Sequence, residues 1–274
     1  RETLIQNKDK AIISKKLVTL KKDVPIKIKI SEFKLKEINK DRLYNFLREM
    51  EFNRLLSSVI STYGDINFKD KNKDFDNKQK KQSISKNNYQ LITKVEEINK
   101  FLSEAEENGE IAIDTETSSL DAHQAKLIGI SLSTKIGKAC YIPIGHKTGI
   151  NLDEKTVIQK IKPILEDQSI KKIGQNIKFD FIILCNRGIN MNAMEDTMLM
   201  SYVLDAGKNR HNMDTLSEIH LGHKTISFKD IVGSGKKQIN FSEVEIDKAK
   251  NYAAEDADIT YRLYKLFSKS LKLE

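Results

Sequence analysis

The sequence has little of what a secreted or membrane protein needs. Its two cysteines, Cys140 and Cys185, lie far apart, so neither a disulfide framework nor a zinc site is indicated and packing in the core is their expected role. No run of about 18 apolar residues could span a bilayer, and the start, Arg1-Glu2-Thr3, lacks both an initiator Met and the apolar stretch of a signal peptide. We expect a soluble, cytoplasmic protein of which this chain is a fragment.

The positive charge is confined to one part of the chain. Residues 1–88 contain 22 Lys and Arg against 12 Asp and Glu, whereas residues 89–274 contain 25 against 27, so the net charge of +8 divides into +10 and −2. A basic segment suits contact with a phosphate backbone. It is equally typical of a solvated lysine-rich surface, so charge alone does not identify a partner.

A polar segment marks the change in charge. Residues 67–88 have almost no apolar side chain and many Lys, Asn, Asp and Ser, a composition that cannot bury surface and predicts a linker. Residues 1–66 and 89–274 are then separate domains. In the first, apolar residues recur every three or four positions from Ile38 to Tyr63, which predicts one or two helices.

Beyond the linker, short apolar strands alternate with helices. Three strands in quick succession predict a meander, and the whole pattern predicts an α/β fold with a mixed β-sheet flanked by helices. The expected strands are residues 110–113, 127–133, 139–144 and 171–174, and the expected helices are residues 153–166, 179–186, 197–204, 213–221 and 247–271.

Two acidic residues come directly after the first of these strands. Side chains alternate along a strand, so Asp114 and Glu116 lie on one side and Thr115 faces away. Like charges so close raise each other's pKa unless a cation neutralises them, and hard ions such as Mg²⁺ and Mn²⁺ prefer oxygen ligands. A solvated strand end is the alternative for this pair taken alone.

Two further segments place acidic groups on helices. Asp180 falls in the first turn of a helix, where the helix dipole favours a negative charge; ordinary capping is the alternative. Tyr252 and Asp256 are four residues apart on the last long helix and therefore share a face. Such a pair could position a water molecule beside a metal-bound carboxylate, although a surface tyrosine with an unrelated aspartate is common.

Taken in order, the segments DTETSSLD, QNIKFD and YAAEDAD resemble the motifs of the proofreading 3′→5′ exonuclease domain of bacterial DNA polymerase I, in the DEDD family. Intervening segments such as EDTMLMSYVL and RHNMDTLSE are also similar, and the resemblance covers about residues 88–271. It implies a ribonuclease-H-like fold. It also implies hydrolysis with two divalent ions, Mg²⁺ with Mn²⁺ able to substitute, acting on single-stranded or frayed DNA 3′ ends to release nucleoside 5′-monophosphates.

The resemblance also assigns roles residue by residue. Asp114 is expected to bridge both ions, Glu116 and Asp256 to complete the site of the ion that holds the attacking water, and Asp180 to serve the second ion. Tyr252 is expected to orient the water. No nucleophile from the protein is needed in this scheme.

Four other positions match the strand-holding residues of that family. Leu120 resembles an apolar wedge against the terminal base and Phe228 an aromatic that contacts a neighbouring base, while Asn176 and Arg210 are expected to contact the strand or its phosphates. Stacking suits a sequence-tolerant single strand because every base has a π-face. Core packing is the alternative for Leu120 and Phe228.

The first domain resembles the C-terminal tail of the 5′-nuclease domain of the same polymerases, through the segment ISKKLVTL followed by Asp23-Val24-Pro25 and through residues 44–52. The catalytic carboxylates of such a domain would lie upstream, and a polymerase domain would follow the chain. We therefore expect neither 5′-nuclease nor polymerase activity here. The resemblance also implies a bacterial, nucleoid-associated location, and we expect a monomer.

Two alternatives come from other classes. A ribonuclease D-like exonuclease would trim RNA with the same four carboxylates, and a catalytically silent module would serve as a scaffold for an attached polymerase. The complete carboxylate set argues against the silent module.

Overall fold

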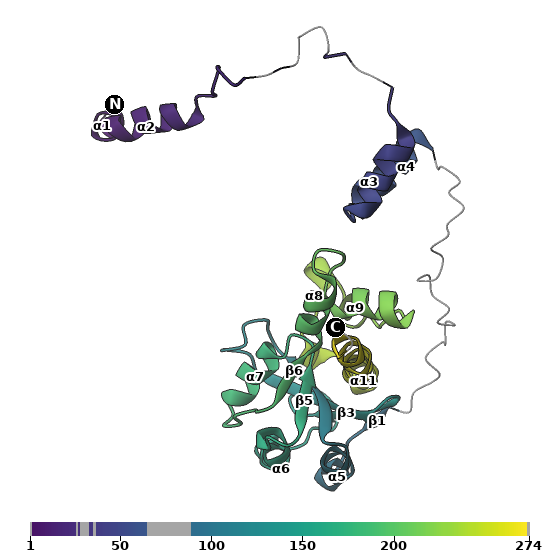
Figure 1. Ribbon diagram of the computed structural model, residues 1–274. Helices are drawn as coiled ribbons and strands as arrows, with labels where there is room; N and C mark the ends of the chain where they lie inside the picture. The colour runs from purple at the N-terminus through teal and green to yellow at the C-terminus, as the bar shows by residue number, and fades with distance from the viewer. Residues whose placement is uncertain (1, 26, 28–32, 35–36, 65–88, 273–274) are drawn as a thin grey trace. The chain divides into compact units, whose positions relative to one another are not determined.

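The computed structural model describes residues 2–25, 27, 33–34, 37–64 and 89–272 (Figure 1). The chain divides into two compact units, Arg1–Lys69 and Asp70–Glu274. The predicted linker of residues 67–88 lies outside the described residues.

The first unit is helical. Its helices are α1 (Glu2–Gln6), α2 (Lys8–Val18), α3 (Lys40–Glu49) and α4 (Asn53–Tyr63). Helices α3 and α4 confirm the helical periodicity predicted for this region. Tyr44 and Leu47 of α3 are buried, and the Tyr44 hydroxyl donates a hydrogen bond to the Gly64 carbonyl. Helices α1 and α2 were not predicted, and α2 has no buried residue.

The second unit contains a six-stranded sheet in the order β1-β4-β3-β2-β5-β6. Strands β2, β3 and β4 pair antiparallel, which confirms the predicted meander, whereas β1, β5 and β6 pair parallel with their neighbours, so the sheet is mixed as predicted. The strands are β1 (Gln90–Leu91), β2 (Glu110–Thr117), β3 (Leu127–Lys135), β4 (Lys138–Pro143), β5 (Lys171–Gly174) and β6 (Met194–Asp196).

Strand β2 is longer than predicted. The apolar run Ile111 to Ile113 marks only its first half, and pairing with β3 continues as far as Thr117. Hydrogen bonding to β3 holds the polar second half extended, which local composition does not reveal. The short edge strands β1 and β6 were missed because two or three residues carry no periodicity.

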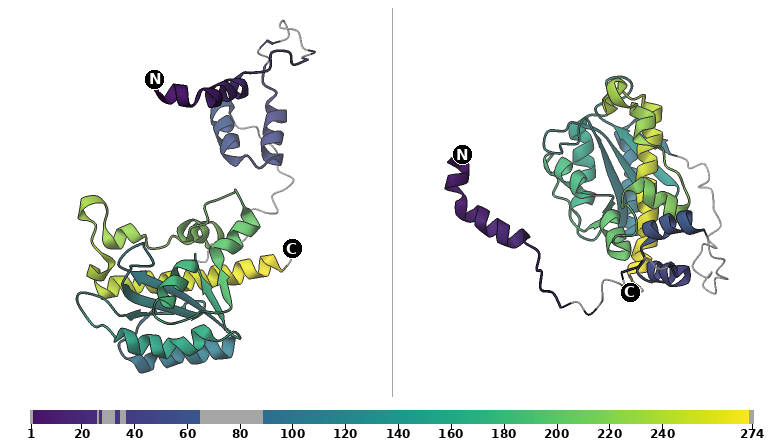
Figure 2. Two further views of the ribbon diagram at one scale, coloured as in Figure 1. Left: turned by 90° about the vertical axis from the view of Figure 1, so that its left-hand side faces the viewer. Right: turned by 90° about the horizontal axis from the view of Figure 1, so that it is seen from above.

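Helices cover both faces of the sheet, and Figure 2 shows α11 on one side and α5 with α6 on the other. Eight of the nine residues of β3 are buried, as this enclosure requires. Helices α5, α6 and α7 build the larger apolar core, and α8, α9 and α11 build a second. The helices are α5 (Asn99–Asn108), α6 (Glu154–Glu166), α7 (Lys178–Cys185), α8 (Thr197–Asp205), α9 (Met213–Leu216), α10 (Phe228–Val232) and α11 (Ile246–Leu271).

Among the described residues, no helix is both long and apolar enough to cross a membrane. Helix α11 has 26 residues, but its buried residues include polar groups such as Asp256, Asp258 and Thr260. Its length serves contact with the sheet.

Asp258 fastens α11 to the sheet. Its carboxylate is fully buried and accepts hydrogen bonds from the Gly137 amide at 2.7 Å and the Tyr89 hydroxyl at 3.0 Å, and it pairs with Arg262 at 3.0 Å. A carboxylate with this many donors is stable without water, because each partner replaces part of its hydration.

We predict that Asp258→Asn lowers the free energy of unfolding by about 3 kcal/mol, since the substitution breaks the ion pair with Arg262 and replaces an oxygen that accepts a hydrogen bond from Gly137 or Tyr89. The midpoint of thermal unfolding should then fall by about 6–12 °C. Glu245→Gln is the control, because the Glu245–Lys248 pair has side chains 66% and 67% exposed and such pairs contribute about 0–1 kcal/mol. Equal midpoints for the two variants would contradict this role for Asp258.

Candidate active site

Three carboxylates meet on the face of the sheet that α11 covers. Asp114 and Glu116 stand on β2, paired with Ser131 and Gly129 of β3, and Asp256 comes from the middle of α11. Each offers an oxygen atom, and these three atoms lie within 4.8 Å of one another. Asp114 and Glu116 share one side of β2, as predicted, and Asp256, which is 140 positions after Glu116 in sequence, joins them there.

Tyr252 completes this cluster from the same helix. Its hydroxyl interacts with the carboxylate of Asp256, one helical turn away, as the spacing predicts. The ring lies 6.0 Å from that of Phe228 and 6.1 Å from that of Phe241, measured between centroids. Tyr252 is therefore held by aromatic contacts on one side and directed at the carboxylates by its hydroxyl.

Asp180 lies beside this cluster, and hydrogen bonds from Thr115 hold its carboxylate in position. It stands in the first turn of α7, as predicted, and is 3% exposed. One of its oxygens accepts hydrogen bonds from the Thr115 amide at 2.8 Å and the Thr115 hydroxyl at 2.6 Å. Thr115 faces away from Asp114 and Glu116, and that orientation is what lets it hold Asp180.

Burial and mutual repulsion make the four carboxyl groups hard to ionise. Desolvation raises the pKa of Asp114 to about 6. Burial also raises the pKa of Glu116 well above its usual value, and the charges of Asp114, Asp256 and Asp180 raise it further. Burial and then the charge of Asp114 raise the pKa of both Asp180 and Asp256, although the bonds from Thr115 and Tyr252 oppose this.

A divalent cation would relieve this repulsion. The oxygen atoms of Asp114, Glu116 and Asp256 are close enough to bind one ion together, and hard ions such as Mg²⁺ prefer carboxylate ligands. The residues therefore fit a divalent metal by number, spacing and chemistry. Asp180 is outside this group of three but close enough to Asp114 for their charges to interact.

Residues 89–272 match the family model described as 3′-5′ exonuclease, that of the family A DNA polymerases. The chain belongs to this 3′-5′ exonuclease family. DNA polymerase I of Pseudomonas aeruginosa is 36% identical over 98% of this chain and 29% of its own length, and that of Borreliella burgdorferi is 35% identical over 99% and 30%. The chain thus spans less than a third of these relatives.

A solved structure supports the fold of the exonuclease domain. RNase D of Escherichia coli superposes with a TM-score of 0.53 and 18% identity over 68% of this chain and 46% of its own. This likeness confirms the ribonuclease-H-like fold and says nothing about the substrate of this chain. The exonuclease domain is a hydrolytic nuclease of the kind found in DNA polymerase I.

The predicted strand-holding residues have different environments. Leu120 is 96% exposed, which excludes core packing. Phe228 is 42% exposed and stacks on Phe241 with a centroid distance of 6.3 Å and an interplanar angle of 4°. Asn176 has a φ of 60° and a buried side-chain oxygen without a hydrogen-bond partner, and Arg210 is exposed. Their contact with DNA stays a prediction.

Sequence reasoning missed two supporting residues of the exonuclease domain. Thr115 holds Asp180, as described. Glu255 accepts a hydrogen bond from the Ile226 amide at 2.6 Å and pairs with His223 at 2.9 Å, and so attaches the segment before Phe228 to α11. The only sequence signal for Glu255 was its place beside Asp256, which is equally typical of an acidic helix.

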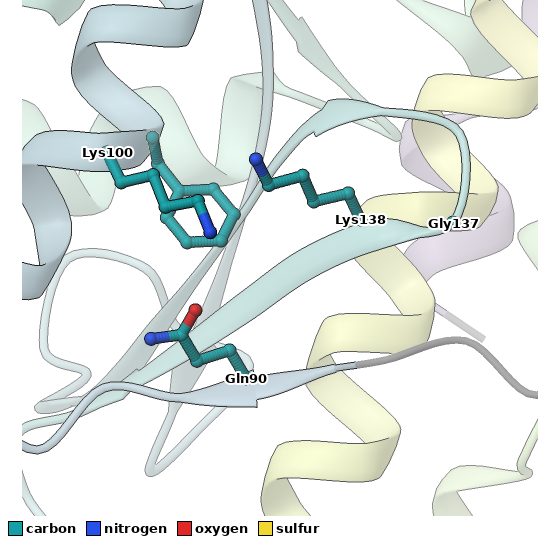
Figure 3. Close-up of a pocket in the computed structure, with 5 residues that line it drawn as sticks. Gln90, Lys100, Gly137 and Lys138 are labelled. Carbon is teal, nitrogen blue, oxygen red and sulfur yellow. The ribbon is translucent and has the colours of Figure 1, made fainter.

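The hollow in Figure 3 is not part of this site. It has a volume of about 400 Å³ and is lined by Gln90, Lys100, Phe101, Gly137 and Lys138. Gly137 lies in the turn between β3 and β4, at the end of that hairpin away from Gly129 and Glu116. Among the described residues no carboxylate lines the hollow, so it lacks the oxygen ligands that Asp114, Glu116 and Asp256 could offer a metal ion.

We predict that the protein in EDTA loses stability as pH rises through about 6. The folded-state pKa of Asp114 is raised from 3.8 to about 6, so between these values the folded protein holds more protons than the unfolded chain, and its stability falls as pH rises. In the Asp114→Asn variant the side chain at this position does not titrate. The unfolding midpoint of this variant relative to wild type should therefore increase between pH 5 and pH 7.5 by about 4 °C or more.

Thermal unfolding of both proteins at the two pH values measures this difference, and Mn²⁺ should raise the wild-type midpoint at pH 7.5 more than that of the variant. An equal difference in unfolding midpoint between the two proteins at both pH values would show that the pKa of Asp114 is not raised in the folded state.

Proposed function

We propose that this chain removes nucleotides one at a time from the 3′ end of single-stranded or frayed DNA and releases nucleoside 5′-monophosphates. The observation that carries the proposal is the meeting of Asp114, Glu116 and Asp256 within 4.8 Å in a chain of the 3′-5′ exonuclease family. The proposal of a DNA substrate follows from the relatives, since two DNA polymerases align with almost the whole of this chain.

Two divalent ions, Mg²⁺ in the cell with Mn²⁺ able to substitute, are the proposed cofactors. Asp114, Glu116 and Asp256 would hold the first, and Asp114 with Asp180 would serve the second. Bound ions of this kind lower the pKa of water and stabilise the charge on a departing oxygen. The protein contributes the fixed carboxylate geometry and needs no nucleophile of its own.

Tyr252 orients the attacking water in this proposal. Its hydroxyl interacts with Asp256, and burial followed by the charge of Asp256 raises the pKa of the phenol. Tyr252 therefore stays protonated at neutral pH and acts as a hydrogen-bonding group. It is not a general base.

The strand is held by stacking and by polar contacts. Leu120 would wedge against the terminal base and Phe228 would stack on a neighbouring one, which gives no preference for sequence. The unpartnered oxygen of Asn176 and the exposed cation of Arg210 would contact the strand and its phosphates.

In the proposed parent protein, residues 1–66 are the end of a 5′-nuclease domain, residues 67–88 a linker and residues 89–274 the exonuclease domain, with a polymerase domain following. We place it as a monomer in the bacterial cytoplasm at the nucleoid. The ribonuclease D-like alternative is weaker, since its support is a likeness of fold at 18% identity. A silent scaffold would not need three buried carboxylates, Glu116, Asp180 and Asp256, beside partly buried Asp114, because such groups are costly to keep.

The central test is degradation of a 5′-labelled DNA oligonucleotide with Mg²⁺ or Mn²⁺. We expect a ladder that shortens from the 3′ end, disappears in EDTA, and slows by more than about a thousandfold in Asp256→Ala, because the metal ions contribute several kcal/mol of transition-state stabilisation. Asp247→Asn on the same helix is the control, as its side chain is 76% exposed.

A folded wild-type protein that gives no ladder would contradict the nuclease proposal. Faster cleavage of an RNA strand of the same sequence would favour the ribonuclease D-like alternative instead.

Leu120→Ala tests the wedge. Since Leu120 is 96% exposed, its truncation should leave the unfolding midpoint within about 2 °C, because surface changes usually cost less than about 0.5 kcal/mol. The KM for a single strand should rise about five- to tenfold through lost contact of about 1 kcal/mol with the base. Unchanged steady-state kinetics would remove Leu120 from the site.

A further inference from the structure

Tyr141 reaches the metal-binding face from a strand that carries none of the carboxylates. It stands on β4, is fully buried, and lays its ring across Gly129 of β3. A methyl group on Gly129 would lie 2.1 Å from the Tyr141 hydroxyl and 2.4 Å from Cζ, so only glycine permits this crossing. Gly129 is the residue paired with Glu116, so the phenol arrives beside the site.

The Tyr141 hydroxyl donates its hydrogen bond to His146. The Tyr141 oxygen lies 2.7 Å from His146 Nε2, and His146 Nδ1 lies 3.2 Å from the Val244 carbonyl. A carbonyl oxygen only accepts, so Nδ1 carries the hydrogen and Nε2 accepts from Tyr141. Because Tyr141 has a single proton, it cannot also donate to Glu116, whose oxygens stay available to a metal ion.

His146 also anchors residues 240–244, a segment that we call the strap. Besides the bond to Val244, the Lys147 amide donates to the Ser242 carbonyl at 2.8 Å. The other end of the strap is attached by the Asn240 side chain, which donates to the Ser118 carbonyl at 2.8 Å. The strap is thus fixed to the turn after β4 and to the loop after β2.

The strap carries Phe241, whose ring contacts those of Tyr252 and Phe228, the two aromatic residues with proposed roles in the reaction. Phe241 is 2% exposed, and its ring centroid is 5.9 Å from that of His146. On its other sides it is 6.1 Å from Tyr252 and 6.3 Å from Phe228. A continuous row of contacts therefore runs from Tyr141 to the rings that would hold the water and the base.

We propose that Tyr141, His146 and Phe241 are positioning residues for the exonuclease reaction. They set the places of Tyr252 and Phe228 through the strap and keep the Tyr141 proton away from Glu116. None of the three touches the substrate. The proposal rests on the proposed roles of Tyr252 and Phe228, and nothing in the sequence pattern distinguishes Tyr141 or His146 from ordinary core residues.

The test is Tyr141→Phe, which keeps the ring over Gly129 and removes only the hydroxyl. We expect kcat on single-stranded DNA to fall about tenfold, or about 1.4 kcal/mol, because His146 loses the partner that fixes its ring. In a Tyr252→Phe background the same change should cost less than about twofold, since neighbours that act through one group are not additive.

Tyr261→Phe is the matched control. Tyr261 is also buried and its hydroxyl donates to Glu110 at 2.6 Å, at the start of β2 and far from Glu116 along the strand. It should lose comparable stability and keep the wild-type kcat. Phe241→Leu, which retains apolar volume and removes the ring, repeats the test should Tyr141→Phe fail to fold.

A readout without catalysis separates this proposal from the proposed function. Aromatic NMR signals of Tyr252 and Phe228 should shift or broaden in Tyr141→Phe and stay in place in Tyr261→Phe. Shifted signals with no nuclease activity in wild type would mean that the positioning is right and the proposed function wrong. Unmoved signals, a kcat within twofold of wild type, or full additivity with Tyr252→Phe would each overturn the positioning role.

Discussion

The arrangement of this domain depends on mutual repulsion among closely spaced carboxylates, three of them buried and one, Asp114, partly buried. Asp114, Glu116, Asp180 and Asp256 gather at one end of β2, where burial raises the pKa of each and the charges of their neighbours raise most of them further. Such a cluster drives itself apart unless rigid elements hold it. The two apolar cores, one on each face of the sheet, supply that rigidity.

Strand β2 distributes the acidic groups between two helices by alternation. Asp114 and Glu116 face α11 and meet Asp256, whereas Thr115 faces the other way and holds Asp180 of α7. A single strand therefore sets the distance between a carboxylate triplet and a fourth, separately oriented carboxylate. This division suits the two-ion reaction proposed above, in which Asp180 would serve the second ion.

The side of the site that would face the substrate is aromatic and polar. Half-exposed Phe228 lies near buried Phe241 and partly buried Tyr252, so the surface proposed for bases is continuous with the core. Glu255 attaches the segment before Phe228 to the same helix that carries Asp256. Asp256, Tyr252 and, through Glu255, the segment before Phe228 are consequently attached to one element, α11.

Local spacing in the sequence determined the parts of the site that lie within one element. The shared side of Asp114 and Glu116 follows from the two-residue period of a strand, and the pairing of Tyr252 with Asp256 from the four-residue spacing on a helix face. The order of the motifs indicated the family. Only the tertiary structure decided which carboxylates meet, that Thr115 holds Asp180, that Leu120 is exposed, and that Tyr141 crosses Gly129 to His146. These contacts join residues of separate elements, and packing of the sheet and helices brings them together, which no local periodicity records.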